Sequence, residues 1–117
     1  MLQKTDPRTL RLIDAAEFIE SLPDDRINTR IWHCGTQACY AGHIILQYGT
    51  REQVGKLINR RYTTPAISPR ILACEILGIC YTDRRATRMF LGGFAGYPVI
   101  SKQDVAGLLR QLAFEEP

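Results

Sequence analysis

The chain has 117 residues, a formal net charge of +3 and 45% hydrophobic residues, which is typical of one ordinary globular domain. This composition excludes a largely disordered chain, and no apolar run approaches the roughly 18 residues that a membrane span needs. The first seven residues lack the apolar core of a secretory signal, so we expect a cytoplasmic protein with no membrane association. Thiols stay reduced there, and the four cysteines are expected to be free.

The positive charge is concentrated in the middle of the chain. Residues 1–25 carry a net charge of −3, whereas residues 26–110 carry twelve bases and four acids, a net charge of +8. A surface of this sign attracts polyanions, and arginine, which supplies twelve of the fifteen bases, suits bidentate contacts with phosphate or carboxylate groups. Arginine-biased codon usage in a G+C-rich genome explains the same composition without a binding function.

The Asp6-Pro7 pair predicts the start of a first helix, because Asp is a favoured N-cap and Pro is favoured at the first helical position. Pro23 ends this helix. Residues 23–35 are expected to form a long connection that is anchored to the core by Ile31 and Trp32. The apolar residues of the first helix recur with helical spacing at Leu12, Ala15, Ala16, Ile19 and Leu22.

Thr36 is expected to cap a second helix over residues 37–48, which Gly49 ends. This helix is apolar on nearly every side, so we expect it to be the central, buried helix. One of its faces would let another helix approach closely, because it carries mostly small side chains: Ala38, Ala41, Gly42 and Ile45.

A capping box of Thr50 and Gln53 predicts a third helix that runs to about residue 62. Its inward residues are expected to be Val54, Leu57 and Ile58.

Three more helices follow from local start and stop signals, over residues 68–77, from Thr82 or Asp83 to residue 91, and over residues 101–112. We therefore expect an all-α fold, in which residues 1–117 form one compact domain of five to six short helices around the helix at residues 37–48. The glycine-rich, aromatic segment at residues 92–97 is a candidate binding loop, although we favour a helix C-cap whose aromatic side chains anchor the turn.

Cysteine and histidine are concentrated at the start of the second helix. Cys39 and His43 are four residues apart and share a helical face, so with Cys34, and with His33 beside it, they could bind zinc. The spacing matches no standard zinc motif. We therefore favour no metal and no cofactor, with the cysteines packed as small hydrophobic side chains and His43 bonded to a loop carbonyl.

The remaining cysteines, Cys74 and Cys80, are expected to pack in the same way. A reactive thiol is the other possibility, since the positive end of a helix lowers the pKa of a cysteine in the first turn, where Cys39 is expected. A papain-type protease would need a histidine far downstream, and none follows His43. No other residues suggest catalysis, so we expect no enzyme.

Residues 70–91 resemble the core of a helix-turn-helix, with Gly78 at the turn. Bases on the second helix would suit phosphates or guanine edges. The pattern is degenerate, because a base, Arg84, stands where the second helix needs an inward apolar residue. The candidate nucleic-acid ligands are Arg84, Arg85 and Arg88, with Lys56, Arg60 and Arg61 beside them.

The chain resembles small uncharacterised proteins of bacteria and their phages. The resemblance rests on Cys-Gly-Thr-x-x-Cys-x-x-Gly-His, which runs here from Cys34 to His43, and on two later pieces, Leu77-Gly78-Ile79 and Met89-Phe90. It implies a helical fold but no activity. Some of these proteins carry Trp at the position of His43, which implies packing rather than metal binding there.

Three functions follow from these patterns as hypotheses. The favoured one is a non-enzymatic protein-interaction module of phage or mobile-element origin, with a protein partner. The alternative is a nucleic-acid-binding protein that uses the degenerate helix-turn-helix, and the second alternative is a zinc-stabilised fold.

Overall fold

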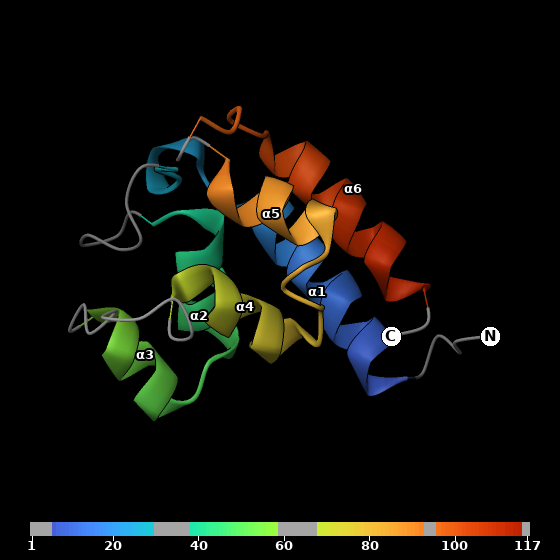
Figure 1. The fold of residues 1–117 in the computed structure, drawn as a ribbon, viewed down its shortest axis with the longest axis horizontal. Helices are drawn as coiled ribbons and strands as arrows, with labels where there is room; N and C mark the ends of the chain where they lie inside the picture. Colours follow the sequence, from blue (N-terminus) through green and yellow to red (C-terminus); the bar gives the residue numbers. More distant parts are fainter. Residues whose placement is uncertain (1–5, 30–37, 59–67, 93–95, 116–117) are drawn as a thin grey trace.

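Six α-helices and one short 3-10 helix make up the regular structure of the part of the chain that the computed structural model describes, residues 6–29, 38–58, 68–92 and 96–115 (Figure 1). No strand occurs in these ranges, where β-pairing is limited to a single bridge between Ile27 and Ala38. The all-α prediction is therefore confirmed. None of the described helices is long and apolar enough to cross a membrane.

The first and last helices form the most extensive helix pair. α1 (Pro7–Ser21) packs along α6 (Lys102–Ala113), and the two run antiparallel (Figure 1). Asp6 caps α1 as predicted, by accepting hydrogen bonds from the N–H groups of the second and third residues that follow it. At one end of the pair, the Thr9 hydroxyl donates to the Ala113 carbonyl at 2.9 Å, and at the other, the Lys102 ammonium donates to the Leu22 carbonyl at 2.8 Å.

α2 (Tyr40–Tyr48) is the central helix, as the sequence predicts. It packs against α1, α3 (Arg51–Ile58), α4 (Pro69–Leu77) and α5 (Arg84–Leu91), and its first six residues are buried. Gly49 ends it at the expected place.

The start of α2 differs from the prediction. The helix begins at Tyr40 with Cys39 as its N-cap, and not at residue 37 with Thr36 as the cap. The reason is a contact with the 3-10 helix η1 (Asp24–Arg26). The Ala38 N–H donates to the Arg26 carbonyl at 3.1 Å, which holds Ala38 in a bridge instead of a helical turn. Thr36 lies outside the described residues.

The capping residues and the glycine that ends α4 lie where the sequence predicts them. Thr50 and Gln53 form the predicted capping box, with hydrogen bonds of 2.8 and 3.2 Å, and α3 buries Leu57. Ile58, expected to point inward, is instead 51% exposed, and the predicted extension to residue 62 lies outside the described part of the chain. Gly78 ends α4 in the left-handed conformation, with φ of 71°.

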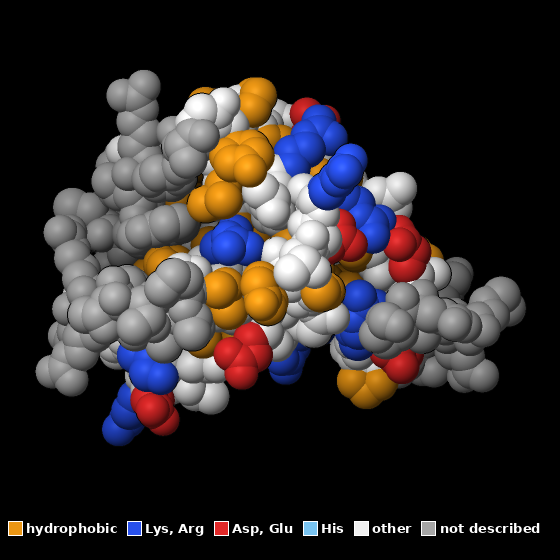
Figure 2. Space-filling view, viewed as in Figure 1, with side chains coloured by type: hydrophobic (Ala, Val, Ile, Leu, Met, Phe, Trp, Pro, Cys, Tyr) orange, Lys and Arg blue, Asp and Glu red, His pale blue; other side chains and the backbone are white. Residues whose placement is uncertain are grey.

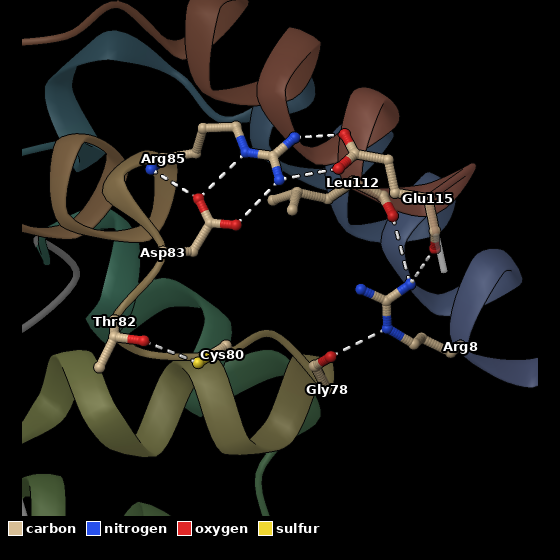
Figure 3. Close-up of polar contacts among 8 residues, drawn as sticks. All are labelled: Arg8, Gly78, Cys80, Thr82, Asp83, Arg85, Leu112 and Glu115. Atoms are coloured by element: carbon tan, nitrogen blue, oxygen red, sulfur yellow. Dashed lines mark hydrogen bonds and ion pairs between the residues drawn. The ribbon is translucent and has the colours of Figure 1, made fainter. Parts of the chain in front are cut away.

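Two arginines, Arg8 and Arg85, make hydrogen bonds between elements that are far apart in the sequence (Figure 3). Arg8 of α1 donates to the carbonyl of Gly78 at 2.9 Å and to those of Leu112 and Glu115 at 3.2 Å each. Arg85 of α5 lies between the carboxylates of Asp83 and Glu115, in a fork of charge-assisted hydrogen bonds. Together they join the turn between α4 and α5 to the ends of α1 and α6.

Candidate functional site

A groove lies between α5, the segment at residues 96–100 and the start of α6. Its volume is about 590 Å³. Most of its lining residues are exposed, so the groove is a feature of the surface and not an enclosed cavity. The groove is lined by Arg84, Thr87, Arg88, Tyr97, Pro98, Val99, Ile100 and Asp104.

Two large hydrophobic side chains are displayed at this groove. Val99 is 71% exposed and Tyr97 is 45% exposed, whereas the next residue, Ile100, is buried. The Tyr40 hydroxyl donates to the Ile100 carbonyl at 2.8 Å, which holds this segment to the start of α2. Residues that are fixed in position and yet leave apolar surface in water are typical of an interaction site.

The same segment is also held by close packing against the end of α5. Gly92 is buried there, and a Cβ added to it would lie 2.9 Å from the Pro98 carbonyl oxygen and 3.0 Å from the Ile100 side chain. Only a glycine allows the segment to approach α5 this closely.

A second depression of about 550 Å³ continues from the groove along α6. Arg88 and Asp104 line both, so the two form one continuous surface, which we call the α5–α6 groove and define by the residues that line either depression. This part presents Leu108 and the exposed ring of Phe114, and the space around Gly107 is open. The remaining lining residues of this second depression are Gln103, Arg110 and Gln111.

The charges of the groove are arranged asymmetrically. Arg84 and Arg88 are exposed on the α5 side, and within the described ranges neither guanidinium has a hydrogen bond or ion pair. On the α6 side stand Asp104, which is exposed, and Arg110, which is paired with Glu20. Figure 2 shows Lys and Arg side chains gathered where α5 lies against α6, beside hydrophobic side chains.

Arg85, the third predicted base of α5, belongs to the structural fork and not to the groove. Its guanidinium holds the pKa of Asp83 and of Glu115 below their usual range, and its own pKa is raised by the two carboxylates. A guanidinium with two carboxylate partners has little capacity left for a phosphate.

The remaining predicted nucleic-acid ligands are not found beside Arg84 and Arg88 in the described part of the chain. Lys56 lies 3.8 Å from Glu52 on α3, which packs on α2 and lies across α2 and α4 from α5 (Figure 1). Arg60 and Arg61 lie outside the described residues. The six predicted bases are therefore reduced to one described pair, Arg84 and Arg88.

At the cysteine–histidine corner, Cys39 and His43 are both buried. The Cys39 sulfur accepts a hydrogen bond from the Gly42 N–H at 3.4 Å, and burial raises the pKa of its thiol to about 12. The lowered pKa that we considered for this cysteine is therefore wrong, because desolvation outweighs the hydrogen bonds of the helix start.

His43 makes the predicted contact with a loop carbonyl. Its Nε2 lies 2.7 Å from the Arg26 carbonyl oxygen. In the described ranges, no group of three or more potential ligands could hold a metal ion, and the other proposed ligands, His33 and Cys34, lie outside those ranges.

The last two cysteines have opposite environments. Cys74 is buried, and burial raises the pKa of its thiol to about 12. Cys80, predicted to be in the core, is exposed, because it lies in the turn between α4 and α5. A hydrogen bond with Thr82, with 2.9 Å between sulfur and oxygen, lowers its thiol pKa.

Only part of this site was predictable from the sequence. The arginines were predicted as candidate nucleic-acid ligands, and Tyr97, predicted to anchor its turn, is 45% exposed. Val99 and Phe114 were missed. For Val99 a signal exists, because two adjacent β-branched residues after Pro98 place one side chain inward and the other outward.

Comparison of the chain with protein-family models, with curated proteins and with solved structures gives no match.

Proposed function

We propose that this chain is a non-enzymatic module that binds a partner protein in the α5–α6 groove. The observation that carries the proposal is the exposed pair Tyr97 and Val99 on a firmly held segment. It lies at a groove with two arginines that have no partner among the described residues. Protein interfaces are enriched in aromatic residues and Arg at their centre, and burial of apolar area supplies most of their free energy.

A protein partner fits this surface better than nucleic acid. Affinity for nucleic acid comes mainly from several bases that neutralise phosphates, and Arg84 and Arg88 are the two unpaired bases of the described groove. The Asp104 carboxylate on the opposite side repels phosphate. Apolar side chains such as Val99 gain little from a phosphate backbone but much from an apolar partner surface.

The resemblance to bacterial and phage proteins stays a prediction, as does a cytoplasmic location.

Site-specific photo-crosslinking in cells of the native host tests the proposed function. A benzophenone amino acid replaces Tyr97 in one variant and Tyr81 in a control. Tyr81 is a matched position, because it is 49% exposed, stacks against Arg70 and lines neither depression. We expect a discrete protein adduct from position 97 that is absent from position 81 and is lost when Val99→Asp is added.

Three outcomes would overturn the proposed function. Identical adducts from both positions would show nonspecific contact, and the absence of any adduct at position 97 would show that the groove is unoccupied. An adduct that nuclease removes would favour the nucleic-acid alternative instead.

A further inference from the structure

We propose that the occupant of the α5–α6 groove is an amphipathic helix of the partner protein, with two carboxylates one turn apart on one edge and a basic or amide side chain on the other. This inference rests on the proposed function and adds the chemistry of the partner. Three charges carry it, together with the exposed apolar side chains that line the same groove.

The first charge pair is on α5. Arg84 and Arg88 are four residues apart, so their side chains leave the same face of the helix one turn apart. Both line the groove and, among the described residues, neither has an acidic partner. The neighbouring Arg85 differs, because two carboxylates of this chain, those of Asp83 and Glu115, already neutralise its guanidinium. Carboxylates from outside the chain are therefore the complement of Arg84 and Arg88.

The opposite edge has the reverse sign. Asp104 lies in the first turn of α6, where Ser101 caps its backbone N–H at 3.1 Å, and its carboxylate is exposed to both depressions. A uniformly acidic partner would be repelled there. A Lys, Arg or Gln on the second edge of the occupant would complement Asp104 and would fix the orientation of the occupant in the groove.

Apolar side chains line the same groove as these charges. Tyr97 and Val99 stand near the start of the groove, and Leu108 and Phe114 continue it along α6. Anchors that follow one another along a groove are the pattern by which an amphipathic helix binds, with apolar residues at helical spacing. Strand addition, the other common mode, needs a sheet edge, and the described parts of this chain contain no strand.

A selection experiment tests this partner class with a defined probe. The probe is an mRNA-displayed library of 16-residue helical peptides, with Leu, Phe, Val or Ala on the apolar face and Glu, Gln or Lys at the two edges. The targets are the wild type, the charge-reversed double variant Arg84→Glu/Arg88→Glu and the control Arg51→Glu/Lys56→Glu. The control changes the net charge equally, on exposed or partly exposed residues of α3.

We expect the wild type and the control to select Glu at two positions four apart on one edge and Lys or Gln on the other. The charge-reversed variant is expected to bind these peptides about tenfold more weakly or worse, and to select Lys at the same two positions. Circular dichroism and thermal melting check that each variant is folded, which is expected since Arg84 and Arg88 are exposed.

The failures are distinguishable. Selected peptides that lose binding with Val99→Asp but show no preference for acidic edges would overturn this partner class and leave the proposed function intact. Selected peptides that bind Val99→Asp as well as wild type, or no enrichment at all, would overturn both. Equal binding of the same acidic peptides by wild type and the charge-reversed variant would also overturn the inference.

Discussion

Arg8 on α1 and Gly78 in the turn after α4 are joined by a hydrogen bond of 2.9 Å between the guanidinium Nε and the carbonyl oxygen, although 70 residues separate them. The same guanidinium reaches the carbonyls of Leu112 and Glu115. One side chain thus donates to carbonyl groups at the C-terminal ends of both α4 and α6 (Figure 3).

Arg8→Met should lower the free energy of unfolding by about 1–3 kcal/mol, because hydrogen bonds from a charged group contribute this much and Met keeps the apolar stem. Urea unfolding measures the change. The control is Arg51→Met, an exposed residue at the start of α3, which should change stability by less than about 0.5 kcal/mol. Equal effects of the two variants would contradict the role that we assign to Arg8.

The fork at Arg85 should make stability depend on pH. The pKa of Glu115 is lowered by its bond to Arg85, so the folded state favours the charged carboxylate. A lowered pKa in the folded state gives stability that is complete above the usual pKa of Glu and is lost as the pH falls through the folded value. The contribution is therefore present at neutral pH and disappears in acid.

Glu115→Gln should accordingly be less stable than wild type at pH 7, and the gap should close as the pH falls through the pKa of Glu115 in the folded state. Denaturant unfolding at a series of pH values measures the gap. Glu52→Gln is the control, because its partner Lys56 lies at 3.8 Å and its side chain is almost fully exposed. A gap for Glu115→Gln that stays constant with pH would show that the charge of this carboxylate is irrelevant to folding.

Helix ends were predictable wherever their signals are local. Asp6, Ser68 and Ser101 cap helices as predicted, since an N-cap bonds only to the next two or three residues. The start of α2 was not predictable in the same way. Ala38 pairs with Arg26 and Asn28, and a bridge between residues ten or more apart leaves no local pattern in the sequence.

The groove was predictable only in part, because a site depends on which surfaces the packing leaves uncovered. Arg84 and Arg88 stood out as bases, but the neutralisation of Arg85 depends on Glu115, thirty residues later. Ile58 is an ordinary hydrophobic residue in the sequence, and its exposure follows from tertiary contacts alone.

The thiols of the described residues should differ in reactivity. Cys80 is exposed with a lowered pKa, whereas Cys39 and Cys74 are buried and burial raises their thiol pKa to about 12. The thiolate is the reactive form, so iodoacetamide at neutral pH should modify Cys80 first. Peptide mapping by mass spectrometry should find Cys39 and Cys74 labelled only after urea is added. Equal labelling of Cys74 and Cys80 in the folded protein would contradict the structure.

Gly78 has a left-handed backbone conformation and Gly107 lies in a helix, so replacing each by alanine should change the free energy of unfolding in opposite directions. Gly78 has φ of 71°, where an L side chain is strained, and its added Cβ would meet the Arg8 side chain at 3.4 Å. Gly78→Ala should therefore lower the free energy of unfolding by about 1 kcal/mol or more.

Gly107 lies inside α6, and no atom would lie within 4 Å of an added Cβ. Gly107→Ala should raise the free energy of unfolding by roughly 0.5–1 kcal/mol, because alanine loses less backbone entropy when the helix forms. Urea unfolding of both variants, side by side with wild type, measures the two changes. A stabilised Gly78→Ala would mean that the turn after α4 is not left-handed, and a destabilised Gly107→Ala would mean that this face of α6 is covered instead of open to a partner.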